Sequence, residues 1–325
     1  MPRLELASRA QIDGIARESY LLWGGGLSLA DYRELWDEVG ATPWCRDHAA
    51  YYVWRDGRGR ALSSMKVYRP ALRLGDRVGR ASVFGAVFTP TVFRRRGFAS
   101  AMLAAGVERS REQGDLAALL FSDIGTRFYA DLGFRALPAP EYLGRLTPGE
   151  PAVEEIGLRP VLASELELFQ RAHAASTRSR PIAILRDAAH WKFLWVRSRA
   201  FFGRVRGAGI RHEWRIASRC GRFAGYVIAV EGRGEWNVRE VASVDGDPRG
   251  MAAILMRAAD DAYRRGCRRV YGWLPPDLAD QLGAWSLDRR ERRRAVPMLR
   301  PGPVTVDPEP LLGAPANHIP FQDQF

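Results

Sequence analysis

The chain has 325 residues, of which 46% are hydrophobic, and a formal net charge of +12. This length and apolar content are enough for a sizeable core and favour two domains over one. No apolar run approaches the roughly 18 residues of a membrane span, and the N-terminus lacks the apolar stretch of a signal peptide. We therefore expect a soluble cytoplasmic protein with no membrane partner.

The positive charge comes almost entirely from arginine, because Lys66 and Lys192 are the only lysines among 49 basic residues. The arginines are spread along the chain, and the densest run, residues 289–294, lacks interleaved aromatic residues. This pattern does not favour nucleic acid as a partner. The three cysteines show no paired or metal-ligand spacing, so we expect neither a disulfide framework nor a bound metal.

The first predicted elements are two helices, over residues 9–23 and 29–39, with glycines between them. Ser28 is the expected N-cap of the second helix. Three apolar or alternating segments then follow between turn sequences, which predicts an antiparallel meander. These segments are residues 51–54, 61–69 and 81–89.

The most informative segment, residues 87–100, reads V-F-T-P-T-V-F-R-R-R-G-F-A-S. An apolar strand stops at a proline, and a basic turn then leads into a helical pattern. A helix N-terminus presents unpaired N–H groups and a partial positive charge, and Gly97 lets an anion approach the main chain. The turn therefore predicts a site for the pyrophosphate of a phosphorylated cofactor. Its residues are Arg94, Arg95, Arg96, Gly97, Phe98, Ala99 and Ser100.

The elements after this turn are predicted from apolar spacing. They are a helix over residues 98–111, a buried strand over 117–121, a helix over 122–134 that ends on Gly133, and a strand over 142–146. Residues 147–157, which contain Pro and Gly, read as a linker.

The second half repeats the pattern of the first. Predicted helices lie at 163–175 and 182–197, strands at 213–218, 223–230 and 236–244, a helix from about 248 to 265, a strand at 269–273, and a helix ending at Leu282 and Gly283. Gly250 follows Gly97 by 153 residues, and Gly283 follows Gly133 by 150, which indicates the repeat of a whole domain. We predict an α/β fold with mixed sheets in two copies, at residues 1–146 and 158–300, followed by a tail at 301–325.

Two motifs resemble the GNAT superfamily of N-acetyltransferases. Arg94, Gly97 and Ala99 fill the fixed positions of its acyl-CoA signature, Gln/Arg-x-x-Gly-x-Gly/Ala. Residues 128–134 resemble its second hallmark, in which the tyrosine, here Tyr129, protonates the departing CoA thiolate. The resemblance implies tandem GNAT folds and an acyltransferase that uses acetyl-CoA as co-substrate.

The tandem arrangement is similar to Eis-like bacterial acetyltransferases and to fungal lysine N6-acetyltransferases. The chain departs from the Eis-like pattern by one extra residue between Pro90 and the arginines and by being too short for a third domain. In the second copy Asp247 replaces Arg94 and would repel a pyrophosphate, while Ala279 falls opposite Tyr129. We therefore expect catalysis only in the first copy, with the second closing the acceptor site or mediating oligomerisation.

The GNAT resemblance also implies the other site residues. The strand before the signature splays from its neighbour and pairs its main chain with the pantetheine arm, which assigns Ala86, Val87 and Phe88 to CoA. The first two helices cover the acceptor pocket in such folds. The candidate pocket residues are Trp23, Tyr32, Trp36, Phe84, Ser122 and Asp123.

An acceptor ammonium of lysine type has a pKa of about 10.4, so some group must accept its proton before attack. Two candidates are Asp123 and the terminal carboxylate of Phe325, which follows the apolar residues Ile319 and Phe321. Eis-like enzymes use their C-terminal carboxylate in the active site, which implies the same role for Phe325. A terminus that frays is the alternative.

We expect acetyl-CoA-dependent acetylation of a primary amine on a small molecule of lysine, polyamine or aminoglycoside type. Acylation of a protein lysine is one alternative, and a non-catalytic acyl-CoA sensor or partner-binding protein is another. The sequence leaves open the acceptor, the acyl chain length and whether the chain forms a homo-oligomer.

Overall fold

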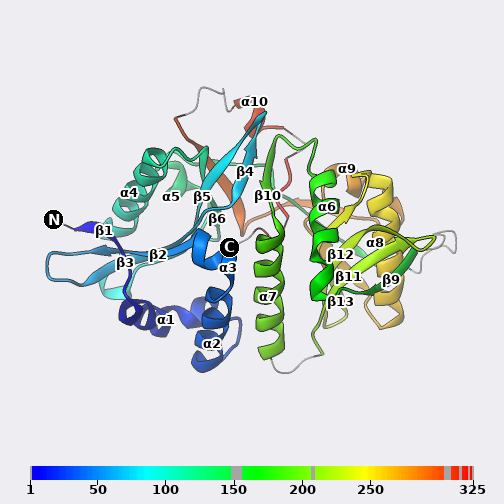
Figure 1. The fold of residues 1–325 in the computed structure, drawn as a ribbon, viewed down its shortest axis with the longest axis horizontal. Coiled ribbons are helices and arrows are strands. Elements are labelled where there is room, and N and C mark those ends of the chain that lie inside the picture. Colours follow the sequence, from blue (N-terminus) through cyan, green and yellow to red (C-terminus); the bar gives the residue numbers. More distant parts are fainter. Residues whose placement is uncertain are drawn as a thin grey trace.

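The computed structural model describes residues 2–147, 156–205, 209–303, 309–314, 317–320 and 323. Within them, two mixed β-sheets lie side by side with helices packed against them (Figure 1). The α/β class predicted from the sequence is confirmed.

The first sheet is built around the predicted meander. Its strands run in the order β1-β2-β3-β5-β6-β16-β7, and β4 and β10 extend it beside β5. They are β1 (Arg3–Leu6), β2 (Ala49–Arg55), β3 (Ala61–Tyr68), β4 (Ala71–Leu74), β5 (Arg77–Phe88), β6 (Ala117–Ser122), β7 (Arg135–Ala136), β10 (Ile182–Leu185) and β16 (Val296–Pro301). All neighbours are antiparallel except β5 and β6, which are parallel and joined by a crossover helix.

Helices cover both faces of this sheet (Figure 1). They are α1 (Arg9–Trp23), α2 (Leu29–Gly40), α3 (Pro43–His48), the 3-10 turn η1 (Thr91–Phe93), α4 (Phe98–Glu112) and α5 (Arg127–Ala130). α1 and α2 lie on one face and α4 on the other. The side-chain oxygen of Ser28 accepts from the N–H of Asp31 at 3.1 Å, which confirms the predicted N-cap of α2.

The second sheet has the order β15-β8-β14-β13-β12-β11-β9. Its strands are β8 (Pro140–Arg145), β9 (Ile156–Pro160), β11 (Arg211–Arg219), β12 (Arg222–Gly232), β13 (Glu235–Ser243), β14 (Arg269–Gly272) and β15 (Asp288–Glu291). The helices of this half are η2 (Ala163–Glu165), α6 (Leu166–Ser176), α7 (Ala188–Arg204), α8 (Pro248–Arg264), α9 (Pro276–Ala279), η3 (Gly283–Trp285) and α10 (Glu309–Leu312). The unit β13-α8-β14 repeats β5-α4-β6, including its parallel pairing.

Two helix predictions are wrong. Residues 122–134 contain only the single turn of α5, because Gly125 takes a φ of 87° and the hydroxyl of Ser122 closes a turn onto the Gly125 carbonyl. Residues 182–185 form β10 instead of a helix, because this apolar run pairs antiparallel with β4, more than 100 residues earlier. α7 begins only at Ala188, with Asp187 as its N-cap.

The two sheets exchange strands. β8 follows the first sheet in the chain but pairs with β14 and β15 in the second sheet. β16 follows the second sheet but pairs with β6 and β7 in the first. The domain limits at 146 and 300 remain a prediction, and the sheets themselves are interlocked by this exchange.

None of the helices in the described part of the chain combines the length and apolar character needed to cross a membrane. The described residues also contain no group of three His, Cys, Asp or Glu side chains placed to hold a metal ion.

Candidate active site

The central strands of the first sheet separate at their carboxyl ends. β5 and β6 are paired from Ala81 opposite Ala117 to Phe84 opposite Leu120. β6 pairs with β16 along the whole of its other side, while β5 continues to Phe88, beyond its last pair with β6. The two strands therefore open a wedge between them.

A bulge shapes the β5 side of this wedge. The register between β3 and β5 shifts after Gly85, and Ala86 takes a left-handed φ of 47°. This conformation is costly for a residue with a Cβ, so it persists only where the surroundings enforce it. Strain of this kind is typical of functional sites.

The wedge opens into a cavity of about 690 Å³. Most of the residues predicted for the site line it, and they come from α1, β5, the turn before α4, and the segment after β6. These are Trp23, Phe84, Ala86, Val87, Phe88, Arg94, Arg95, Gly97, Phe98, Ala99, Ser100, Asp123 and Tyr129. Sequence positions more than 100 residues apart are thus brought together in this cleft.

The N-terminus of α4 faces this cleft without a side-chain cap. Gly97 occupies the N-cap position with a φ of 77° and has no side chain to offer the first N–H groups. Arg94 folds the turn back by donating from Nε to the Thr89 carbonyl at 3.0 Å. Because these N–H groups keep their partial positive charge, the turn fits an anion.

The corresponding helix of the second half is closed. Asp247 caps α8 by accepting from the N–H of Arg249 at 3.2 Å, and Pro248 follows at the first helical position. A carboxylate therefore already occupies the place that an anionic ligand would take.

The wedge of the second half is also filled. β13 and β14 pair only from Glu235 opposite Arg269 to Val238 opposite Gly272. The space beyond amounts to about 10 Å³, and its walls include His318 and Pro320 from the C-terminal segment. Among the described residues, the second half thus repeats the fold of the first without an open cleft between β13 and β14.

Tyr129 lies in α5 at the edge of the first cleft and is 7% exposed. Its ring packs edge-on against Phe128 and Phe134. Burial, with a smaller contribution from the charge of Asp123, raises the pKa of Tyr129 to about 12. Among the described residues no group hydrogen-bonds to its hydroxyl, so the phenol is a protonated donor at neutral pH with its O–H unused.

Asp123 and Ser122 have different environments. Asp123 is exposed at the rim of the cleft, where its Oδ1 accepts from the N–H of Ala295 at 2.9 Å. Ser122 is fully buried and donates its hydroxyl to the Gly125 carbonyl. Its side chain holds the turn and is not among the described residues that line the cleft.

Arg96 is exposed, with its guanidinium 5.4 Å from the ring centre of Phe98, and is also absent from the described lining. The terminal carboxylate of Phe325, and Phe321, lie outside the described residues. Asp323 is described: it is buried and accepts from Arg186 Nε at 2.8 Å.

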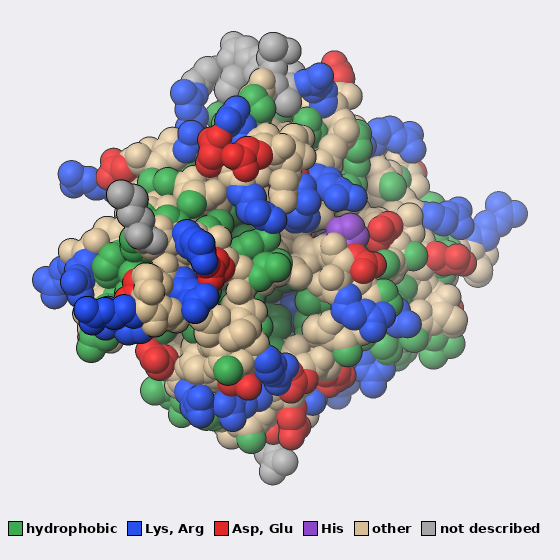
Figure 2. Space-filling model, turned by 60° about the vertical axis from the view of Figure 1, so that its left-hand side comes forward, with side chains coloured by type: hydrophobic (Ala, Val, Ile, Leu, Met, Phe, Trp, Pro, Cys, Tyr) green, Lys and Arg blue, Asp and Glu red, His purple; other side chains and the backbone are tan. Residues whose placement is uncertain are grey.

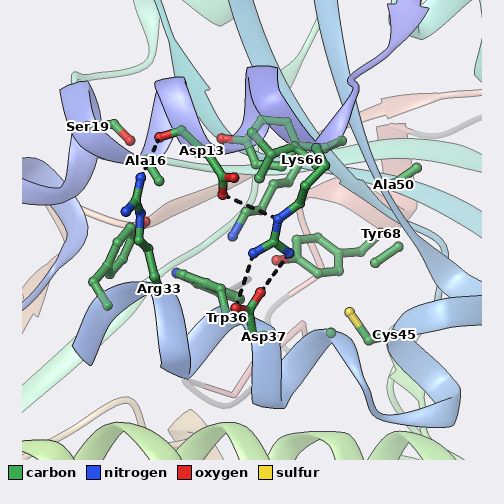
Figure 3. Close-up of a pocket in the computed structure, with 16 residues that line it drawn as sticks. Asp13, Ala16, Ser19, Arg33, Trp36, Asp37, Cys45, Ala50, Lys66 and Tyr68 are labelled. Atoms are coloured by element: carbon green, nitrogen blue, oxygen red, sulfur yellow. Dashed lines mark hydrogen bonds and ion pairs between the residues drawn. The ribbon is translucent and has the colours of Figure 1, made fainter. Parts of the chain in front are cut away.

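Tyr32 and Trp36 line a different cavity, of about 240 Å³, between α1, α2, β2 and β3 (Figure 3). Lys66 reaches into it from β3, with its amine 3.0 Å from the ring centre of Trp36 and 5.7 Å from that of Tyr51. Burial lowers the pKa of Lys66 to about 7. We did not single out Lys66 from the sequence, although a lysine between the buried residues Met65 and Val67 of an apolar strand was a usable signal.

The face in Figure 2 carries many basic side chains, interspersed with acidic ones, and is hollowed near its centre over hydrophobic side chains. Such a surface attracts anionic ligands from solution.

The fold and the cleft together define the class of protein. Residues 31–137 match the family model described as an acetyltransferase (GNAT) domain. The chain therefore contains a GNAT acetyltransferase domain and is an acyltransferase. No curated protein matches the chain significantly in sequence.

Solved structures share the fold over nearly the whole chain. A probable N-acyltransferase from Enterococcus faecalis has a TM-score of 0.69 at 13% identity, over 93% of this chain and 73% of that one. Eis1 from Mycobacterium abscessus gives 0.57 at 14%, over 93% and 74%. A tandem GNAT protein from the clavulanic acid biosynthesis pathway gives 0.53 at 16%, over 94% and 100%. The predicted tandem GNAT fold is confirmed, whereas the resemblance to fungal lysine acetyltransferases stays a prediction.

Proposed function

We propose that the cleft between β5 and β6 binds acetyl-CoA and that the first half of the chain transfers the acetyl group to a primary amine of a small molecule. One observation carries this proposal. The uncapped N-terminus of α4, the bulge at Ala86 and the residue Tyr129 all border the same cavity.

The residues present suit a long, anionic acyl carrier. The N–H groups at Gly97, Phe98 and Ala99 and the guanidinium groups of Arg94 and Arg95 would hold the pyrophosphate. On the side of the cleft, the strand end from Ala86 to Phe88 does not pair with β6, so its main-chain groups there suit the amides of a pantetheine arm. A cleft of about 690 Å³ is also in the range of cofactor sites.

Tyr129 supports the catalytic part of the proposal. A phenol with a pKa of about 12 stays protonated at neutral pH and can donate to a thiolate leaving group. A hydroxyl with no other partner among the described residues is free to make that contact. A non-catalytic sensor has no need of such a donor, so this environment favours an enzyme.

Release of free thiol from acetyl-CoA tests this proposal, with lysine, cadaverine, spermidine, an aminoglycoside and a lysine-containing peptide as acceptors. We expect turnover with at least one small amine and little with the peptide. Turnover with the peptide alone would favour a protein acceptor, and tight acetyl-CoA binding with no turnover would favour a sensor.

A further inference from the structure

The amine of Lys66 lies in the pocket between α1, α2, β2 and β3 without a carboxylate partner among the described residues. Its contacts are aromatic, with the rings of Trp36 and Tyr51. Figure 3 shows the side chain extending from β3 toward Trp36. Removing an ammonium group from water without an ion pair costs free energy, so a lysine at this position does not stabilise the fold.

The two acidic residues of the pocket are already paired with another cation. Arg9 makes a bidentate contact with Asp37, at 2.7 and 3.1 Å, and its Nε lies 3.3 Å from Asp13. Dashed lines in Figure 3 mark the contacts that end on Asp13 and Asp37. Neither carboxylate is therefore available to neutralise the lysine.

Two further donors of the pocket are unsatisfied. The indole N–H of Trp36 and the Nε of Arg33 are buried and have no hydrogen-bond partner among the described residues. Both residues line the pocket, as does Lys66. The unmet hydrogen-bonding groups here are thus donors, and a ligand that satisfies them must bring acceptors.

The pocket also lies next to the cleft. Lys66 is directly opposite Gly85 in the β3–β5 ladder, and Gly85 lines the cleft. α1 contributes to both cavities, through Ser19 to the pocket and through Trp23 to the cleft. A small molecule held at Lys66 is therefore close to the strand end where the acetyl group would be presented.

We propose that this pocket binds the carboxylate of an amino-acid-sized acceptor, with Lys66 as its ionic partner and the aromatic walls around its body. The acceptor role rests on the proposed function, whereas carboxylate binding does not. A volume of about 240 Å³ suits an amino acid better than an aminoglycoside. Polyamines carry only positive charge, which the lysine and the arginines of the pocket disfavour.

The charge of Lys66 makes binding depend on pH. A carboxylate partner raises the pKa of Lys66 above its value of about 7 in the free protein, so binding above pH 7 takes up a proton. Affinity is then greatest below pH 7 and falls by up to tenfold per pH unit above it. The other titratable or charged groups around Lys66 are Arg9, Asp13, Tyr32, Arg33, Asp37, Cys45, Tyr51, Tyr68 and Arg197.

Calorimetric titration with 3-phenylpropionate, and with its uncharged amide, tests the site without any chemistry. We expect the carboxylate to bind at least tenfold more tightly than the amide at pH 6.5 and to lose that advantage at pH 9. Lys66→Met, which fits the apolar surroundings and should fold, is expected to bind the two probes equally. Lys192→Met removes the other lysine, which is exposed on α7, and should behave as wild type.

Turnover assays distinguish a failure of carboxylate binding at Lys66 from a failure of the proposed acetyl transfer. Lysine and cadaverine differ only by the carboxylate, and we expect lysine to have the lower KM in wild type and not in Lys66→Met. Carboxylate binding that needs Lys66, with no amine acetylated, upholds the pocket and contradicts the proposed function. The opposite result is that amines are acetylated, but the carboxylate and the amide bind equally or Lys66→Met leaves their binding unchanged. This result overturns carboxylate binding at Lys66 and leaves the proposed function standing.

Discussion

Lys66 and Gly85 are opposite each other in the antiparallel β3–β5 ladder, yet they line different cavities. One belongs to the pocket under α1 and α2, and the other to the cleft between β5 and β6. Since glycine has no side chain, Gly85 places no side chain between the pocket and the cleft. The proposed acceptor and acyl-donor sites therefore meet at this residue pair.

Replacing Tyr129 with phenylalanine removes the proposed proton donor. We expect kcat for thiol release to fall about 100-fold or more, because general-acid catalysis contributes about that much. The affinity for acetyl-CoA should stay within about twofold, since the ring and its packing remain. Steady-state kinetics and calorimetric binding measure the two effects separately.

Tyr263→Phe in α8 is the matched control, because it removes a hydroxyl from the second half of the chain. It should leave kcat unchanged. Equal activity of Tyr129→Phe and wild type would show that another group protonates the thiolate. With a pKa of about 12, Tyr129 should also cause no loss of activity between pH 7 and 10.

Two substitutions at Ala86 test whether the left-handed backbone of the bulge is needed for acetyl-CoA binding. Ala86→Val places a β-branched residue at a φ of 47°, which should cost about 1–3 kcal/mol of unfolding free energy and weaken acetyl-CoA binding. Ala86→Gly fits this φ without strain and should retain both properties. Urea unfolding measures the stability of both variants, and calorimetric titration measures their affinity for acetyl-CoA. Equal stability and equal affinity of the two variants would argue against a functional bulge.

A buried ionic cluster joins the C-terminal segment to the second sheet. Arg186 contacts Glu240 at 2.9 Å and Asp323 at 2.8 Å, and all three side chains are almost fully buried. Arg186→Met leaves two buried carboxylates without their cation. We expect a loss of about 3–5 kcal/mol in unfolding free energy at pH 7, measured by urea denaturation.

The same cluster predicts sensitivity to acid. Burial acts to raise the pKa of Glu240, but Arg186, His173 and Tyr226 together lower it to about 2. A folded-state pKa below the unfolded value stabilises the protein above about pH 4.5, and this stabilisation is lost as the pH falls toward 2. Glu240→Gln should flatten that part of the pH profile of unfolding free energy. An unchanged slope would show that folding does not lower the pKa of Glu240.

Local sequence patterns were sufficient for most of the elements that carry the cleft, but not for the single turn of α5 that carries Tyr129. The capping serine and apolar spacing predict α1 and α2, and the alternating segments predict the meander. The glycine after three arginines predicts the start of α4. Each of these signals arises within a few residues of the element that it describes.

Features that depend on distant partners were not predictable in this way. β10 was predicted as part of a helix because its pairing with β4 is not visible locally. The exchange of β8 and β16 between the sheets depends on neighbours about 130 and 175 residues away in sequence. A lysine within an apolar strand marks Lys66 in the sequence, but its lack of an acidic partner depends on the fold, which pairs both acidic residues of the pocket with Arg9.

Calorimetric titration of acetyl-CoA into wild type, Gly97→Asp and Gly97→Asn directly tests the proposal that acetyl-CoA binds at the N-terminus of α4. Both substitutions place a similar side chain at the N-cap of α4, but only aspartate adds the charge that Asp247 brings to α8. We predict one site per chain in wild type and a loss of affinity in Gly97→Asp about 100-fold greater than in Gly97→Asn. Two sites per chain, or equal affinities of the two variants, would contradict binding of the pyrophosphate at the N-terminus of α4 alone.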